Sequence, residues 1–165
     1  PETASADIPA LRLAASIMSR GESSRLYREL VRNKQIAQQA EMDLELNAEG
    51  GRISFIAIAS EKGTSEELEK ALLEELSKIQ KDGVTEKELE KAKNQIITSS
   101  LKLRETNDGK AISIERSIVY AGRASAVNED IQKLQVVTIA DIQRVMNKYF
   151  KPNNRVVIYY NQEKK

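Results

Sequence analysis

The sequence has 165 residues, 40% of them hydrophobic and 31% charged, which suits one domain that buries roughly 70% of the surface its unfolded chain exposes. The 26 basic and 25 acidic side chains nearly cancel, so no basic surface predicts nucleic-acid binding. Histidine and cysteine are absent, which excludes disulfides, thiol nucleophiles and a catalytic zinc site within this chain. No apolar run approaches the ~20 residues of a membrane span.

Two short helices are predicted before the chain reaches residue 34. From Ile8 to Met18 the apolar residues recur at helical spacing, and Gly21 then ends the pattern as a helix C-cap does. Ser23 or Ser24 begins the second helix, which continues to about Asn33.

The pattern then changes to a period of two, which predicts an antiparallel hairpin. From Ile36 to Leu46, alternate residues share an apolar face, and this face includes Gln38. The residues from Asn47 to Gly51 favour a turn. The second strand runs from Arg52 to Ser60 and is apolar on both faces, which predicts a more central place in the sheet.

Most of the remaining chain is predicted to be helical. Two capping boxes, Thr64 with Glu67 and Thr85 with Glu88, begin long amphipathic helices. The second of these breaks near residues 107–109 and resumes from residue 112 to residue 120. Two shorter helices begin at residues 128 and 138. Residues 155–160 are rich in β-branched and aromatic side chains, which predicts a closing strand.

Strands grouped beside runs of helices predict an α+β fold of two layers. We expect an antiparallel or mixed sheet with helices packed on one face. Residues 1–165 form a single domain, in which residues 1–6 are a linker and residues 162–165 are a charged tail. The small polar start and the lack of an initial methionine indicate a fragment of a longer chain.

Two patterns that suggest ligand sites have simpler explanations. Glu86, Glu88 and Glu90 lie in a first helical turn, where the helix dipole favours carboxylates, so we interpret them as a solvated face rather than a cation site. The stretch from Gly21 to Arg25 lacks the lysine and the glycine density of a phosphate-binding loop. No motif predicts a cofactor.

Three segments, in order, resemble one family. They are residues 10–14 leading to Gly21-x-Ser23-Ser24-Arg25-Leu26-Tyr27-Arg28-Glu29-Leu30; Gly83-Val84-Thr85-x-x-Glu88-Leu89-x-x-Ala92-Lys93; and Val137-Thr138-x-x-Asp141-Ile142 onward to Tyr149. Together they are similar to the zinc metallopeptidases that include insulin-degrading enzyme, pitrilysin and the mitochondrial processing peptidase. The resemblance covers nearly the whole chain.

The resemblance implies a clamshell of paired α+β domains, of which one holds zinc and the other closes over it. Without histidine, this chain resembles the second, non-catalytic domain, so zinc is expected in a partner domain of the same polypeptide or in a separate subunit. In such domains an arginine and, seven residues later, a tyrosine help bind the substrate. Val31 and Gln38 occupy those positions here. Arg32 and Gln39 could replace the pair only if the register slipped, which would turn Gln39 to the opposite face of the strand.

Two functions follow from the resemblance. In the first, the domain has no activity alone and pairs with a zinc-bearing domain to enclose peptide substrates, with the strand from Ile36 to Leu46 offering an edge to an extended peptide. The alternative use of Met42, Leu44 and Leu46 is simply to contact the covering helices. In the second function the domain is a structural or assembly module with no role in proteolysis, as in the core subunits of respiratory complexes. Analogy with bacterial members implies a periplasmic or secreted protein.

Overall fold

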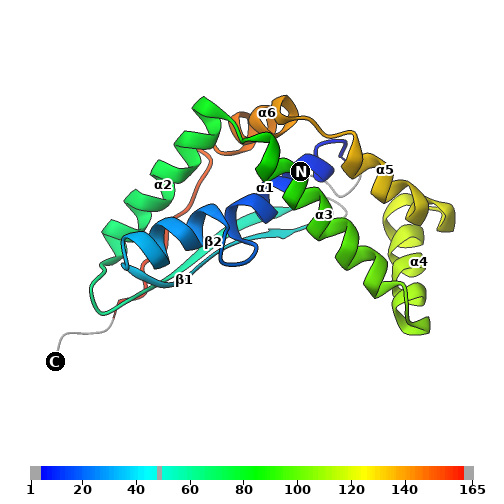
Figure 1. The fold of residues 1–165 in the computed structure, drawn as a ribbon, viewed down its shortest axis with the longest axis horizontal. Helices are drawn as coiled ribbons and strands as arrows, with labels where there is room; N and C mark the ends of the chain where they lie inside the picture. Colours follow the sequence, from blue (N-terminus) through cyan, green and yellow to red (C-terminus); the bar gives the residue numbers. More distant parts are fainter. Residues whose placement is uncertain (1–4, 48–49, 162–165) are drawn as a thin grey trace.

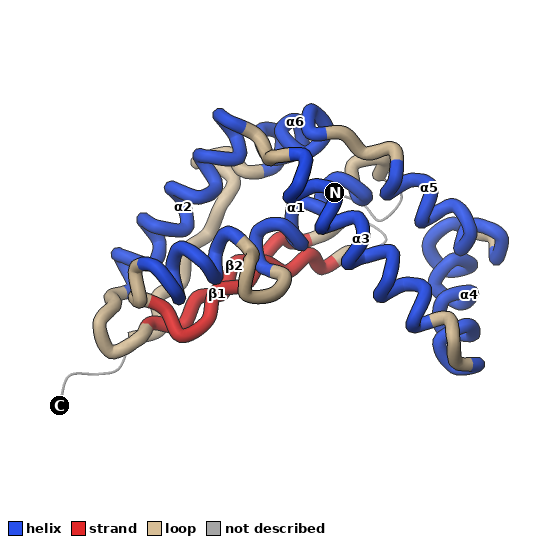
Figure 2. Tube along the Cα trace, in the orientation of Figure 1, coloured by secondary structure: helices blue, strands red, loops and turns tan. Residues whose placement is uncertain are grey.

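The computed structural model describes residues 5–47 and 50–161. The predicted charged tail, the first four residues of the predicted linker and the centre of the predicted hairpin turn lie outside these residues. The chain has the predicted α+β fold, with a two-stranded antiparallel sheet on one side and helices on the other (Figure 2).

The hairpin consists of β1 (Ala37–Glu45) and β2 (Arg52–Ala59). Met42 lies opposite Phe55, and a register shift between Ala37 and Gln39 introduces a bulge at Gln38. The bulge changes the predicted alternation at the start of β1, because Ala37 is buried while Gln38 is exposed. Beyond the bulge the alternation is as predicted, with Ala40 and Met42 facing the core.

Helices α1 (Ile8–Ser19) and η1 (Tyr27–Asn33) form the first part of the layer that covers the sheet. Both contact β1. The predicted second helix is present from residue 25, but from Tyr27 it has π-helical hydrogen bonding. Such wide turns are rare, and no feature of the residue pattern distinguishes them from an ordinary α-helix.

The other helices form an arc over the sheet and beyond it (Figure 1). Both predicted capping boxes are confirmed: they begin α2 (Ser65–Asp82) and α3 (Glu86–Leu103). Helix α3 leads away from the sheet to α4 (Asn107–Ala121), η2 (Ala124–Asn128) and α5 (Glu129–Gln135). Helix α6 (Ile139–Tyr149) returns the chain to α1 and α2.

The helix break near residue 107 lies earlier than predicted. Thr106 caps α4, so residues 107–109 form its first turn instead of interrupting it. Gly109 is required there, because a Cβ atom would lie 1.6 Å from the carbonyl oxygen of Leu103.

The hydrophobic core lies between the helical layer and the inner face of the sheet. Its fully buried side chains come mainly from the helices, and the largest are Leu11, Leu13, Met18, Leu26, Leu30, Ile79, Leu89, Leu134, Ile142, Val145 and Met146. Met42 is also buried, and Leu44 and Leu46 pack against this core. These three side chains therefore face the hydrophobic core.

Two predictions about the sheet are wrong for the described residues. Residues 155–160 are extended but pair with neither strand. The second arm of the hairpin is not central, because β2 has β1 as its one neighbour.

Candidate functional site

The first two family-like segments meet in one ion pair. Arg25 donates from Nε and from one terminal nitrogen to the two carboxylate oxygens of Glu88, at 2.7 and 2.8 Å, and it also donates to the carbonyl oxygen of Gly83 at 3.2 Å. Glu88 additionally accepts from the backbone N–H of Thr85 at 2.8 Å. The Arg25 guanidinium, with burial opposing it, lowers the pKa of Glu88 to about 2. This bidentate pair ties the turn after α1 to the start of α3.

The third segment holds the two ends of the domain together. Thr138 and Asp141 form a capping box at the start of α6. From the same helix, Arg144, Lys148 and Tyr149 donate to the carboxylate of Asp7 at 2.6, 2.7 and 2.8 Å. Hydrogen bonds from Lys148 outweigh burial and hold the pKa of Asp7 well below its usual range.

These contacts give the motif residues a structural role. Arg25, Glu88 and Asp141 bind side chains and backbone groups of their own domain. Sequence reasoning identified the capping glutamates but missed the link from Arg25 and the use of Asp7. The one sequence signal for Asp7 is an acidic residue directly before the Ile8-Pro9 helix start, which does not indicate contacts with α6.

The predicted site residues Val31 and Gln38 lie in different surroundings. Val31 is on η1, half-buried, and packs against the hydrophobic core. Gln38 is the exposed bulged residue of β1 and borders a small open depression with Gln35, Ser60 and Lys62. A bulge re-aims the side chain that it carries, so Gln38 points away from the face shared by Ala40 and Met42.

The neighbouring pair Arg32 and Gln39 is exposed. Gln39 donates to the Glu41 carboxylate at 2.8 Å, along the outer face of β1. Gln39 therefore lies on the outer face of the sheet, whereas Val31 on η1 packs against the hydrophobic core.

The outer face of the sheet is exposed to solvent in the described chain. From β1 it carries Gln39, Glu41, Asp43 and Glu45, all exposed, and Glu45 accepts from Arg52 at 2.5 Å. From β2 it carries Ile56 and Ile58, which are 56% and 47% exposed. This face combines carboxylates with apolar side chains and suits contact with a polypeptide rather than with a small anion.

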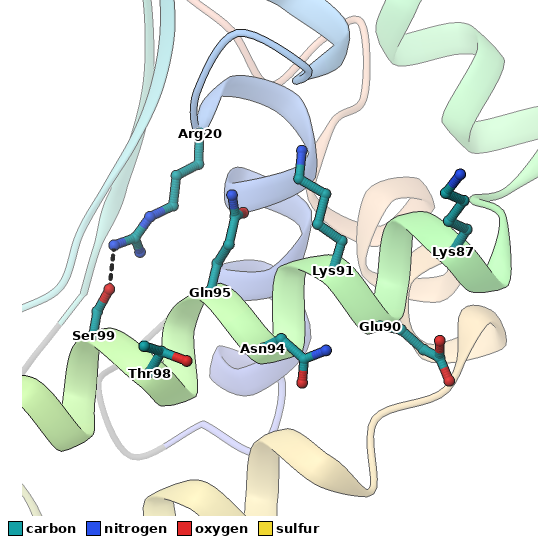
Figure 3. A pocket seen from close by; sticks show the side chains of 8 residues that line it. All are labelled: Arg20, Lys87, Glu90, Lys91, Asn94, Gln95, Thr98 and Ser99. Atoms are coloured by element: carbon teal, nitrogen blue, oxygen red, sulfur yellow. Dashed lines mark hydrogen bonds between the residues drawn. The ribbon is translucent and has the colours of Figure 1, made fainter.

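An open groove of about 590 Å³ lies on the other side of the molecule, along α3 (Figure 3). Arg20 reaches into it and donates to the hydroxyl of Ser99 at 2.7 Å. Lys87, Glu90 and Lys91 line its other end, and Lys91 contacts Ser23. The groove has no imidazole or thiol, and its lining offers hydrogen bonds and the charges of Arg20, Lys87, Glu90 and Lys91.

Comparison with known proteins assigns the family. Residues 1–96 match the model of the peptidase M16 inactive domain. The chain belongs to this family. No curated protein sequence matches the chain significantly.

Several solved structures have the same fold as this chain. A protease from Helicobacter pylori is 26% identical, with a TM-score of 0.84, and the match covers 93% of this chain but 37% of that one. The inactive peptidase domain of a proposed zinc protease from Bordetella parapertussis is 21% identical, with a TM-score of 0.84, over 94% of this chain and 84% of that one. A chain of complex III from Candida albicans is 17% identical, with a TM-score of 0.75, over 89% of this chain and 37% of that one.

The residues of this chain do not fit a catalytic zinc ion. Imidazole and thiolate ligands are absent from the sequence, and the described residues contain no group of three acidic side chains placed to hold a metal. Within the same part of the chain, no helix is both long and apolar enough to cross a bilayer.

Proposed function

We propose that this domain pairs with a zinc-bearing peptidase domain and forms the non-catalytic half of a chamber that encloses peptide substrates. The observation that carries the proposal is membership of the M16 inactive-domain family in a chain without histidine or cysteine. The Helicobacter pylori protease is much longer than the matched region, which agrees with a domain that works beside other domains.

The outer face of the sheet is the surface we assign to the substrate. Among the described residues β1 pairs with β2 alone, so its other edge can add an extended peptide through backbone hydrogen bonds. Glu41 and Asp43 beside this edge favour peptides that carry lysine or arginine. Val31 and Gln38 stand at the positions where the family has an arginine and a tyrosine. Val31 contributes apolar packing instead of a positive charge, and Gln38 contributes an amide instead of a phenol.

A reconstitution experiment tests this role. The native protein should bind the zinc-bearing domain and raise its rate of peptide cleavage, and it should cleave nothing alone. Charge reversal on the sheet, Glu41→Lys with Asp43→Lys, should lower the kcat/KM for a basic peptide by about tenfold, since two charges that favour it become repulsive. The matched control, Glu105→Lys with Glu115→Lys, changes the same charge on the distant arm of α3 and α4 and should leave cleavage unchanged.

The proposal fails if the native protein neither associates with the zinc-bearing domain nor changes cleavage. If the two double substitutions lower kcat/KM equally, the sheet is not the substrate-binding surface. That second result would still allow the domain to pair with the zinc-bearing domain, but the substrate would bind elsewhere.

The alternative function is a structural or assembly module, and the mismatched Val31 and Gln38 favour it. The fold similarity to a chain of complex III agrees with this alternative. Under it, the double substitution Val31→Arg with Gln38→Tyr leaves cleavage unchanged in the reconstituted enzyme. A gain of tenfold or more would contradict the alternative, provided that circular dichroism shows the variant to be folded.

A further inference from the structure

The groove along α3 has a basic row of side chains on one side. This row has a spacing of four residues, which places its members on one face of the helix, and it consists of Lys87, Lys91, Gln95 and Ser99. Figure 3 shows the two lysines on the side of α3 where Arg20 lies, whereas Glu90 points the other way. The basic row and Arg20 therefore share one side of the groove, and the carboxylate lies on the other.

The cations of this basic side have neutral partners. Arg20 donates to the hydroxyl of Ser99 at 2.7 Å, and Lys91 donates to the hydroxyl of Ser23. Lys87 forms no hydrogen bond or ion pair with the described part of the chain. A carboxylate accepts from a cation more strongly than a hydroxyl does. Each of the three cations can therefore bind an anion that enters the groove.

The excess of positive charge continues into α1. Arg12 lies about two turns before Arg20, is half-buried, and has no hydrogen-bond or ion-pair partner among the described residues. Burial lowers the pKa of Arg12; the charge of Asp130 opposes this effect, and the charges of Arg116 and Arg20 add to it. An anion at the Arg20 end of the groove would thus lie near several arginines.

The length and the neutral groups of the groove favour a polypeptide. From Lys87 to Ser99 the basic row spans about 18 Å, the length of about five or six residues of extended chain. Asn94, Gln95 and Thr98 each offer a donor and an acceptor, as the N–H and C=O of a peptide group require, whereas a phosphodiester only accepts. The side chains that line the groove are all polar or charged, so none of them can stack on a nucleic-acid base.

We propose that this groove binds an acidic segment of a partner polypeptide, in which two carboxylates contact Lys87 and Lys91 and a third replaces Ser99 as the acceptor of Arg20. The two lysines lie about 6 Å apart along the helix axis, which matches the spacing of alternate side chains in an extended chain. The segment therefore carries aspartate or glutamate at alternate positions. The groove lies on the helical layer, away from the outer face of the sheet, and the inference does not depend on the proposed function.

A labelled acidic peptide tests the groove. The probe is a peptide of alternating glutamate and serine, about twelve residues long so that it exceeds the basic row, and fluorescence anisotropy measures its binding to the native protein. Binding should weaken at least about tenfold between about 20 mM and about 300 mM salt, since the contacts are exposed to solvent. Lys87→Glu with Lys91→Glu should also weaken it at least about tenfold, because two attractive charges become repulsive.

The matched control is Lys70→Glu with Lys81→Glu. It makes the same change of net charge with two exposed lysines of α2 and should weaken binding less than about twofold. All four lysines are exposed, and circular dichroism checks that both variants fold. The absence of binding at low salt overturns the proposal. Equal losses in the two variants also overturn it, since the peptide then responds to net charge alone. A single-stranded oligonucleotide of the same charge that binds as tightly, and is lost in the same variant, overturns the choice of a polypeptide.

The hydrogen bond between Arg20 and Ser99 gives a second matched pair, because either partner can remove it. Arg20→Gln should weaken binding of the acidic peptide about threefold, since one charge contact is lost. Ser99→Ala removes the same hydrogen bond but leaves the guanidinium free for the peptide, so the affinity should stay the same or rise. Equal losses in the two variants would mean that the hydrogen bond shapes the groove, and would contradict the contact between Arg20 and the peptide.

Discussion

In the helical layer α1 and α6 bury Leu11 and Ile142 completely, whereas in the sheet β2 leaves Ile56 and Ile58 about half exposed. Capping boxes begin α2, α3 and α6, and ion pairs join Arg25 to α3 and Asp7 to α6. Within the part of the chain that the structure describes, the sheet has two strands, and its outer face is open to solvent. The difference shows that the described chain buries the apolar side chains of its helical layer far more completely than those on the outer face of its sheet.

The largest contrast is expected from truncating one apolar side chain in each layer. Leu11→Ala removes a fully buried side chain and should lower the free energy of unfolding by about 3 kcal/mol. Ile58→Ala removes a half-exposed one and should cost less than about 0.5 kcal/mol. Urea denaturation followed by circular dichroism measures both. Equal costs in the chain of residues 1–165 would show that the sheet is already covered.

A smaller effect is expected where the first and last helices are joined. Asp7→Asn removes the charge that accepts from Arg144, Lys148 and Tyr149, and should cost about 2 kcal/mol at pH 7. Asp43→Asn on the sheet should cost almost nothing, because Asp43 is exposed and pairs with no cation among the described residues.

The pH dependence of this cost has a definite sign. The pKa of Asp7 is lower in the folded chain than its ordinary 3.8, so its stabilising effect is complete above about pH 5. The effect is lost as the pH falls below that ordinary value. The difference between the native chain and Asp7→Asn should therefore shrink from pH 5 to pH 2, and a constant difference over that range would contradict the assignment.

A third contrast compares two arginine ion pairs. Arg25→Lys replaces the fork that binds both oxygens of Glu88 and should cost about 1.5 kcal/mol. Arg52→Lys alters the pair with Glu45 on the sheet, where the arginine side chain is 73% exposed, and should cost less than about 0.5 kcal/mol. Thermal unfolding of both variants at pH 7 provides the comparison. Similar costs would mean that the ion pair of Arg25 does not stabilise the contact between the turn after α1 and the start of α3.

The helices could be predicted from sequence because their signals are local. Thr64 with Glu67, and Thr85 with Glu88, satisfy backbone groups three residues apart, and the apolar period then continues for several turns. The π-helical turns from Tyr27 and the link from Arg25 to Glu88 depend on how α1, η1 and α3 pack, which no short segment encodes.

The sheet could be predicted only in part, since its pairing depends on distant residues. The hairpin and most of its inner face follow from alternation, but one extra residue at Gln38 reverses the faces at the start of β1. The apolar faces of β2 and the β-rich composition of residues 155–160 both predict strands with partners. In the described chain β2 pairs with β1 alone and residues 155–160 pair with no strand. The composition therefore predicted pairing that the described residues do not form.

The candidate site shows the same division. Val31 and Gln38 were located by their order in the chain, but whether two side chains converge depends on the bulge and on the turns of η1. The structure places Val31 against the core and Gln38 in solvent. Their roles toward a substrate remain a prediction that the reconstituted enzyme tests.

The smallest contrast lies where the helical layer passes into the sheet. Gln35 has a φ of 55°, in the left-handed region, which costs a residue with a Cβ atom about 1 kcal/mol or more. Its carbonyl oxygen accepts from the Ser60 hydroxyl at 2.7 Å, which holds this conformation in place. Gln35→Gly should therefore raise the free energy of unfolding by about 0.5 kcal/mol, after the added freedom of the unfolded glycine is subtracted.

Gln39 provides the matched control four residues later. It lies in β1 without a positive φ, so Gln39→Gly should lower the free energy of unfolding by about 0.5 to 1 kcal/mol. The two substitutions are identical in chemistry and opposite in expected sign, and urea denaturation of both distinguishes them. If Gln35→Gly also destabilises the chain, the left-handed turn into β1 is held by the Gln35 side chain, whose amide oxygen accepts from Lys62 at 3.4 Å, and not by its backbone.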